Sequence, residues 1–207
     1  MKLGGYQCAA AGRTAEERLA VLDRHIAGQE CDLVLCPELF LSGYRAGAAG
    51  LAETPDGPLA ARIARLARSH GTAIAYGYPE RAGDRLFNSA LLIGADGVML
   101  ANHRKRLPSP QSFEEATFAN GKSVTFAETN GVRIAMIICY EVEFPESLRQ
   151  AARGGADLVL VPTALGAAWG VVAEKLVTTR AFENGVWLAY ADHAGEEDGL
   201  AFYGGSR

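Results

Sequence analysis

The stretch VRIAMIICYEVEFPES, residues 132–147, decides the fold class of this chain. It starts as a nearly continuous apolar run and reaches Cys139. Three glutamates then follow, together with Pro145, a residue suited to the first turn of a helix. Continuous apolar runs of this length are typical of strands that helices cover on a parallel or mixed sheet. We therefore expect an α/β layered architecture.

Similar runs occur on both sides of this stretch and alternate with helical patterns. Thr14 with Glu17 is the pattern of a capping box at a helix start, and residues 95–97 (Ala-Asp-Gly) are typical of a hairpin turn. A long polar stretch at 102–122 separates two halves of the chain that are similarly arranged. The expected strands are 2–9, 31–36, 72–78, 88–94, 98–102, 122–126, 132–139, 157–162 and 186–192, and the expected helices begin near residues 14, 58 and 145 or end near 183–185.

Composition limits the classes of function. The 207 residues are 49% hydrophobic and 21% charged, which favours one globular domain over residues 1–207. The net charge is −4, and the basic cluster at 103–106 is too short to indicate nucleic-acid binding. No apolar run is long enough for a membrane span, and the first residues lack the core of a secretory signal. We expect a cytoplasmic protein with no nucleic-acid or membrane partner.

The cysteines and histidines do not form a recognisable metal or disulfide pattern. No two of the four cysteines have CxxC spacing, and the four histidines are scattered. This argues against a structural zinc site and against a disulfide framework. We expect chemistry without a metal or any other cofactor.

Several chemically useful side chains follow buried strands. Glu38 comes after strand 31–36, Lys105 after the hairpin, and Cys139 at the end of its apolar run, with Glu114 or Glu115 as a fourth candidate. A nucleophilic thiol needs a base or a nearby cation, and Glu38 and Lys105 could supply these. Taken alone, each residue also has a structural interpretation. Cys139 could be a buried structural cysteine, Glu38 a capping carboxylate and Lys105 one member of a solvated basic patch.

Three segments taken together resemble the signatures of a known family. LVLCPELFLSGY (33–44), HRKRL (103–107) and IICYEVEFPE (137–146) are similar, in order and context, to those of the nitrilase superfamily of carbon-nitrogen hydrolases. The resemblance covers essentially the whole chain. It implies a four-layer α-β-β-α sandwich and association through helical faces into a homodimer or larger homo-oligomer. The chain stops at AFYGGSR, where family members continue, so we expect the C-terminal strands of the family fold to be absent.

The resemblance also implies roles for individual residues. Glu38 matches the general base, Lys105 the lysine and Cys139 the nucleophile of the family's triad. The sequence EEATFANG makes Glu114, four residues before a phenylalanine, a better match than Glu115 to a second glutamate found in many members. The backbone N–H of Tyr140 would join Lys105 in stabilising an oxyanion.

The remaining acids of the opening stretch have different expected roles. We expect Glu141 to make structural hydrogen bonds and Glu146 to lie in the first turn of a helix, where a carboxylate is favourable. Glu143 is a candidate for the wall of the substrate pocket. The segment 161–170, with Ala164 and Trp169, should border the acyl group, and its small and apolar residues favour a small, mostly uncharged one.

The resemblance leaves more than one reaction open. CYE followed by FPE looks like the amidase and carbamoyl-hydrolase branches, so the favoured substrate is a small linear amide, cleaved through a cysteine thioester. An N-carbamoyl hydrolase and a nitrilase are the alternatives within the family. Two functions from other classes also remain open: a catalytically silent binding module and a thiol redox protein. A redox protein would need a resolving cysteine near Cys139, and the nearest one in the sequence is Cys36.

Overall fold

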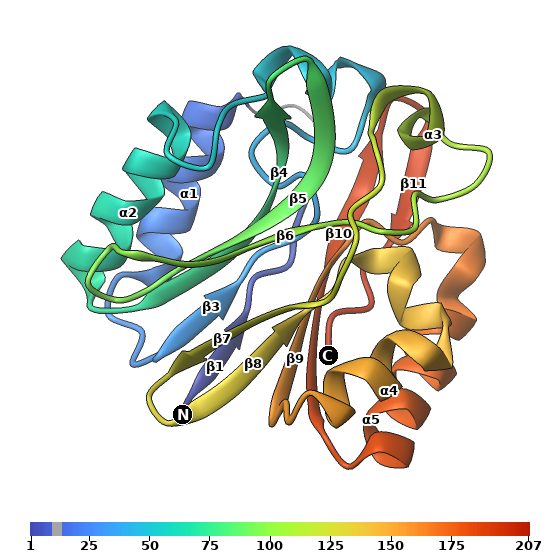
Figure 1. The fold of residues 1–207 in the computed structure, drawn as a ribbon. Helices are drawn as coiled ribbons and strands as arrows, with labels where there is room; N and C mark the ends of the chain where they lie inside the picture. The colour runs from blue at the N-terminus through green and yellow to red at the C-terminus, as the bar shows by residue number, and fades with distance from the viewer. Residues whose placement is uncertain (10–13) are drawn as a thin grey trace.

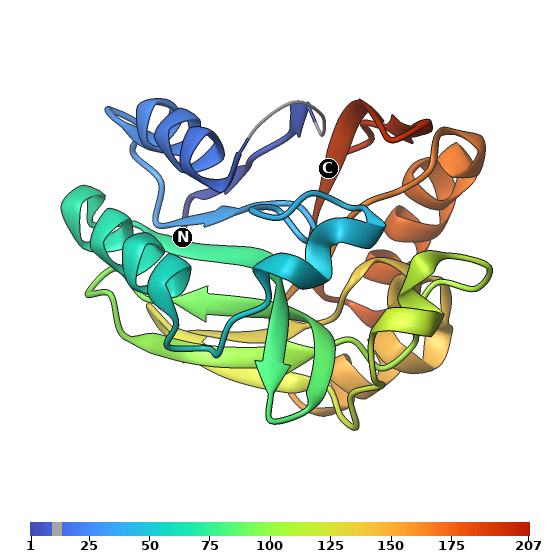
Figure 2. The ribbon, with the colours of Figure 1, turned by 90° about the horizontal axis from the view of Figure 1, so that it is seen from above.

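The computed structural model describes residues 1–9 and 14–207, and it contains two β-sheets that face each other between two pairs of helices (Figure 1). Helices α1 (Ala15–Ile26) and α2 (Pro58–His70) cover one sheet, and α4 (Pro145–Arg153) and α5 (Val177–Asn184) cover the other. Seen from above, the blue and teal helices lie on the opposite side from the orange ones (Figure 2). The expected α-β-β-α layering is confirmed.

The first sheet has the strand order β1-β3-β4-β5-β6. Its first three members are parallel and the last three pair antiparallel, with β5 and β6 joined by the expected hairpin. The short helices η1 and α3 belong to the connections of this half. The bounds are β1 Leu3–Gly5, β3 Leu33–Leu35, η1 Ala46–Leu51, β4 Ala73–Ala82, β5 Arg85–Ile93, β6 Met99–Arg104 and α3 Phe113–Thr117.

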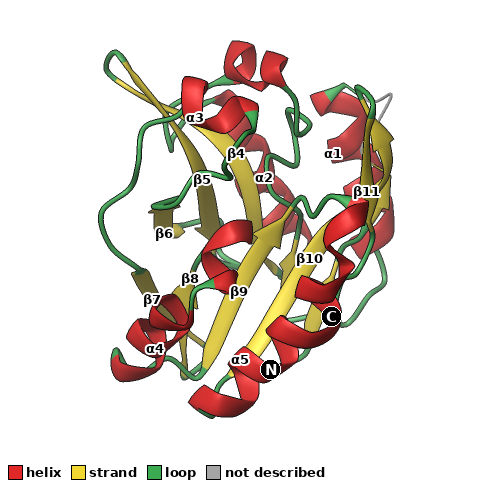
Figure 3. Cartoon of the chain, turned by 90° about the vertical axis from the view of Figure 1, so that its right-hand side faces the viewer, coloured by secondary structure: helices red, strands yellow, loops and turns green. Residues whose placement is uncertain are grey.

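The second sheet has the order β11-β10-β9-β8-β7, and the short strand β2 pairs with β10. Figure 3 shows β9 and β10 behind the helices α4 and α5. Short helical turns (η2, η3 and the π-helical η4) follow β8 and β9. The bounds are β2 Cys8–Ala9, β7 Thr125–Thr129, β8 Val132–Met136, η2 Cys139–Glu143, β9 Leu158–Thr163, η3 Ala167–Trp169, η4 Val172–Leu176, β10 Trp187–Glu197 and β11 Leu200–Tyr203.

Strand β9 illustrates why the apolar runs are continuous. Successive side chains of a strand point to opposite faces. Leu158 and Leu160 pack between the two sheets, while Val159 and Val161 pack under the helices of the outer layer. Both faces are therefore buried, and an alternating polar position would leave an unpaired polar group in the core.

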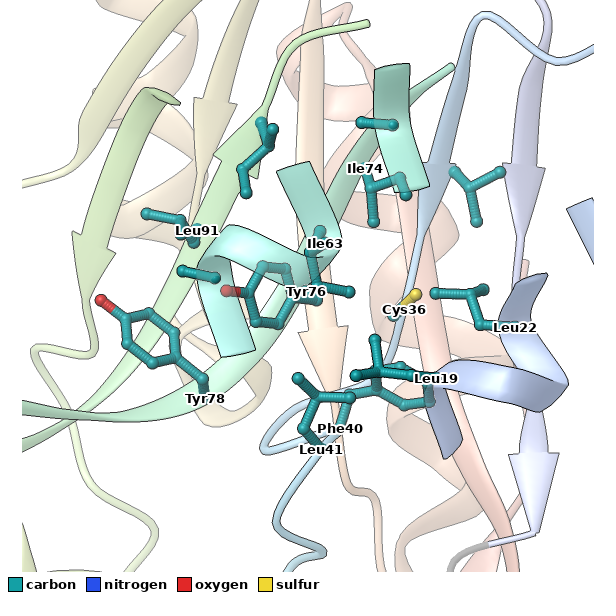
Figure 4. Packing of buried hydrophobic residues seen from close by; sticks show 14 of the residues in the cluster. Leu19, Leu22, Cys36, Phe40, Leu41, Ile63, Ile74, Tyr76, Tyr78 and Leu91 are labelled. Atoms are coloured by element: carbon teal, nitrogen blue, oxygen red, sulfur yellow. The ribbon is translucent and has the colours of Figure 1, made fainter. Parts of the chain in front are cut away.

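The outer face of the first sheet is packed against α1 and α2. Leu19 and Leu22 of α1 and Ile63 of α2 meet Cys36 and Tyr76 from the sheet side (Figure 4). The predicted capping box is present, because the Thr14 side chain and the Glu17 carboxylate each accept a backbone N–H of the other. These contacts hold the first helix on the sheet whose loops carry part of the site.

Some predicted boundaries are wrong. The expected strand 2–9 is two strands, because β1 pairs in the first sheet and β2 in the second. The strand predicted to end at residue 78 continues to Ala82 and turns directly into β5. Strand β8 ends at Met136, so Cys139 starts the turn η2 instead of ending a strand.

Within the described residues, no helix is both long and apolar enough to cross a membrane.

Candidate active site

Cys139 lies at a sharp turn between β8 and α4. Its backbone has φ 45°, in the left-handed region that side-chain-bearing residues seldom adopt. The turn brings the side chain to the wall of a cavity, although only 7% of the residue is exposed. A strained, nearly buried position of this kind is typical of a functional group instead of a packing residue.

Glu38 lies just after β3 and is completely buried. The following residue, Leu39, also has a left-handed backbone, with φ 47°. The loop passes directly over Gly77 of β4, where an added Cβ would lie 2.6 Å from the Glu38 Cα and 2.4 Å from the Leu39 nitrogen. Glycine at this position therefore lets the Glu38 loop approach the sheet.

Lys105 follows β6 and is 1% exposed. Its Nζ donates to Glu38 Oε1 at 2.7 Å and to Glu114 Oε1 at 2.8 Å, and it lies 3.3 Å from the Ser109 Oγ. A buried ammonium with two carboxylates leaves one excess negative charge in the site, which a titrating proton or a polar substrate can offset. Lys105 is therefore buried in the site and is not a member of a solvated basic patch.

Glu114 is held in the first turn of the short helix α3. Its carboxylate accepts hydrogen bonds from the Tyr44 hydroxyl and from the Asn88 amide, the latter at 3.2 Å. The same Asn88 nitrogen donates to Glu38 Oε1 at 2.7 Å. Asn88 therefore bridges the same two carboxylates that Lys105 bridges.

The charges of the site perturb one another. Burial raises the pKa of Glu38 to about 7, with Lys105 opposing the rise and Glu114 adding to it. Burial also raises the pKa of the Cys139 thiol, and so does Glu38, while Lys105 lowers it. Burial alone would lower the pKa of Lys105, but Glu38 and Glu114 raise it well above the ordinary value. Lys105 is therefore an ammonium, and Glu38 is suited to exchange a proton near neutral pH.

A second buried cluster supports the turn at Cys139. Glu141 accepts a hydrogen bond from the Ile138 backbone at 2.8 Å, from His103 Nε2 at 2.9 Å and from Arg106 Nε at 2.6 Å. Arg106 also donates to Ser147 Oγ at the start of α4. These bonds tie the residue before Cys139 to β6 and α4, and they fix the direction in which the cysteine points.

Cys139 opens on a cavity of about 380 Å³. All four residues expected at the oxyanion or substrate position, Tyr140, Glu143, Ala164 and Trp169, line this cavity. Trp169 is 63% exposed and so lies at its mouth. The rest of the wall comes from the loop after Lys105, from the loop after β9 and from single residues elsewhere: Tyr44, Ser109, Pro110, Gln111, Ser112, Leu165, Gly166 and Leu200.

The structure brings the four predicted catalytic residues together from three connections: Glu38 follows β3, Lys105 and Glu114 lie between β6 and β7, and Cys139 follows β8. Two contributors were missed: Asn88 on β5 and the Tyr44 hydroxyl. An asparagine inside an otherwise apolar strand is the one sequence signal that could have indicated Asn88, since buried polar groups need partners. Among the described residues, no group of three or more His, Cys, Asp or Glu side chains could hold a metal ion.

Comparisons with known proteins show which family this chain belongs to. The model of the carbon-nitrogen hydrolase family matches residues 6–207. A protein of Pseudomonas protegens named "Hydrolase in pqqF 5'region" is 38% identical over all of this chain and 74% of its own length. An (R)-stereoselective amidase of a Pseudomonas species is 33% identical over 86% of this chain, which spans 65% of that relative.

The chain is also similar to solved structures. The crystal structure of an amidase from a Nesterenkonia species matches with a TM-score of 0.91 and 33% identity, over 100% of this chain and 81% of that one. A cysteine-to-alanine variant of that amidase, in complex with butyramide, matches with a TM-score of 0.90 and 34% identity, over the same shares of the two chains.

The fold and the family match define this chain as a carbon-nitrogen hydrolase of the nitrilase superfamily. Within that superfamily it belongs to the amidase-like branch, as its relatives and structural neighbours indicate.

Proposed function

We propose that this protein hydrolyses the amide bond of a small linear amide, releasing ammonia and a carboxylic acid through a thioester on Cys139. The observation that carries the proposal is the position of Cys139 between the cavity and the buried Glu38-Lys105-Glu114 cluster. Nucleophile, base and cation then act on one substrate carbonyl.

In the acylation step, Glu38 takes the proton of the Cys139 thiol as the sulfur attacks the amide carbonyl. The carbonyl oxygen becomes an oxyanion, which the Lys105 ammonium and the Tyr140 backbone N–H stabilise. Tyr140 lies in the first turn of η2, where backbone N–H groups have no partner within the helix. Glu38 then returns the proton to the leaving nitrogen, the carbon-nitrogen bond breaks, and ammonia departs.

In the deacylation step, water attacks the thioester carbonyl and Glu38 takes a proton from that water. The carbon-sulfur bond breaks, the acid leaves, and Cys139 regains its proton from Glu38. One carboxyl group thus acts as base and then acid in each half of the reaction, for which the raised pKa of Glu38 is suited. Glu114 positions Lys105 between the two carboxylates.

The size of the cavity supports a small acyl group. About 380 Å³ is near the lower end of ligand pockets. Ala164, Leu165 and Gly166 form a wall of small and apolar residues behind the reacting carbon. The butyramide bound to the Nesterenkonia amidase variant is a substrate of this chemical type.

The test is an ammonia-release assay with acetamide, propionamide and butyramide, with matching nitriles and N-carbamoyl amines in parallel. We expect release from the amides and at least a thousandfold loss in Cys139→Ala. Cys31→Ala is the matched control, because Cys31 is a free cysteine outside the cavity. Unchanged release in Cys139→Ala, or no turnover of any compound by wild-type protein, would overturn the proposal.

A further inference from the structure

One residue of the substrate cavity has no part in the mechanism above. Among the residues that line the cavity, Glu143 is the only one with a carboxylate, and none is a lysine, arginine or histidine. The other titratable side chains in the wall are Cys139, Tyr44 and Tyr140. The charge that a substrate meets in this wall is therefore set by Glu143, with Lys105 buried behind it.

The Glu143 carboxylate makes no hydrogen bond or ion pair with any of the described residues. The neighbouring guanidinium of Arg180 binds the main chain of Glu143 and other atoms, not this carboxylate. Arg180 donates to the Val142 carbonyl at 3.3 Å, to the Glu143 carbonyl at 2.9 Å and to the Glu183 carboxylate at 3.0 Å. The main chain of Glu143 is thus held in place while its side chain stays unpaired in the cavity.

Glu141, two residues earlier, shows the contrast. Both of its carboxylate oxygens are occupied by hydrogen bonds to the protein. An acid that only supports the turn is saturated in this way, whereas a half-buried acid without partners incurs a desolvation cost that a ligand can remove. Burial raises the pKa of Glu143, with Lys105 opposing the rise, as expected for a carboxylate without a partner of its own.

Glu143 and Cys139 are the last and first residues of η2. A 3₁₀-helix rises about 2 Å per residue, so four residues place their Cα atoms within about 8 Å along the axis. A group two or three bonds beyond the amide carbonyl of a substrate bound at Cys139 can reach the Glu143 carboxylate. The group that this carboxylate binds most strongly is a protonated amine.

We infer that the pocket selects amides whose acyl chain carries a protonated amine, and that Glu143 is the residue that recognises this amine. The inference rests on the proposed function for the reaction and adds the class of substrate. The same carboxylate repels an acyl chain that ends in a carboxylate. The amine is recognised in the ground state, so its effect falls on KM more than on kcat.

Three amides of similar length test the inference: butyramide, 3-aminopropanamide, which has an ammonium in place of the terminal methyl, and succinamate, which ends in a carboxylate. For wild-type protein we expect kcat/KM to be about tenfold higher for 3-aminopropanamide than for butyramide, and about tenfold lower for succinamate. In Glu143→Gln the three values should come within about threefold of one another. Glu146→Gln, a nearby exposed acid outside the cavity, is the matched control and should behave as wild type.

Turnover of butyramide separates the two proposals. If wild-type protein cleaves butyramide but shows no preference for the amine, or if Glu143→Gln keeps the preference, the inference about Glu143 is wrong and the proposed function stands.

A second measurement does not depend on turnover. Methanethiosulfonate reagents that carry an ammonium, a methyl or a sulfonate group are reacted with Cys139, and the rate is followed by peptide mass mapping in a Cys31→Ser background. The ammonium reagent should react faster than the sulfonate reagent by a ratio that falls about tenfold in Glu143→Gln. An equal ratio in both proteins would overturn the inference even if no amide were cleaved.

Discussion

The segment 103–106 supplies two buried charge clusters from neighbouring side chains. Lys105 lies between Glu38 and Glu114, whereas His103 and Arg106 lie on either side of Glu141. Both clusters combine cations with carboxylates that are completely buried. They differ in whether every carboxylate oxygen accepts a hydrogen bond.

In the Glu141 cluster, both carboxylate oxygens accept hydrogen bonds from side chains or the backbone. In the Lys105 cluster, Oε2 of Glu38 is buried without any partner among the described residues. An unsatisfied oxygen costs stability, but it remains free to receive a proton. The comparison indicates that the saturated cluster builds the turn and the unsaturated one carries out the reaction.

The largest effect should come from removing the shared cation. Lys105→Met leaves two carboxylates buried without their ammonium, so we expect a loss of about 3–5 kcal/mol in the free energy of unfolding. Amide hydrolysis should fall at least about a thousandfold, because the oxyanion also loses its cation. Urea unfolding and ammonia release measure the two effects. Loss of less than 1 kcal/mol together with activity within about tenfold of wild type would refute this assignment.

Breaking the other cluster should mainly affect stability. Glu141→Gln removes the carboxylate that accepts hydrogen bonds from His103 and Arg106, and we expect a loss of about 1.5–3 kcal/mol in the free energy of unfolding. Activity per folded molecule should fall by only about tenfold, through a less rigid turn at Cys139. If Glu141→Gln were as inactive as Lys105→Met while fully folded, the distinction between the clusters would fail.

A smaller effect should follow from crowding the Glu38 loop. The Cβ of Gly77→Ala would meet the backbone of Glu38 and Leu39 well inside van der Waals distance. We expect a loss of about 1–3 kcal/mol and, as Glu38 moves from the thiol, about tenfold lower kcat. Gly5→Ala is the control, because nothing lies within 4 Å of its added Cβ. Equal behaviour of the two variants in unfolding and turnover would show that the close approach is unimportant.

The smallest effect is a displacement of the pH profile. Glu38 must be ionised to accept the thiol proton, so kcat/KM should rise with pH through the pKa of Glu38, which is about 7. Glu114 raises that pKa by its charge, and Glu114→Gln should therefore move the rising limb to lower pH. Measuring kcat/KM for butyramide from acid to neutral pH tests this. A limb that stays in place or moves to higher pH would show that Glu114 does not act on Glu38 in this way.

The sequence predicted the layers and the positions of most strands, because long apolar runs reflect burial on both faces. It missed the extension of β4 into β5, although Gly83-Asp84 is a hairpin signal between two strands. It also missed α3, because a helix of five residues is too short to show a helical pattern of apolar positions.

The candidate site was predictable where a polar residue follows a buried run, as with Glu38 and Lys105. Asn88 could not be placed in this way, because it lies within β5 and acts only through pairing with residues 50 and 26 positions away. The family resemblance separated the structural role of Glu141 from the pocket position of Glu143, but the spacing of the two acids after Cys139 could not show which carboxylate has hydrogen-bond partners. That difference depends on where His103, Arg106 and Arg180 point in three dimensions.

The central claim is that the unsaturated Glu38 cluster drives acylation of Cys139. The most direct measurement is peptide mass mapping of protein quenched with acid during turnover of butyramide, in wild type, Glu38→Gln and Glu141→Gln. We expect a butyryl group on the peptide that contains Cys139 in wild type and in Glu141→Gln, and none in Glu38→Gln. Ammonia release by wild type with no acyl group on Cys139, or acylation of Glu38→Gln at the wild-type level, would contradict it.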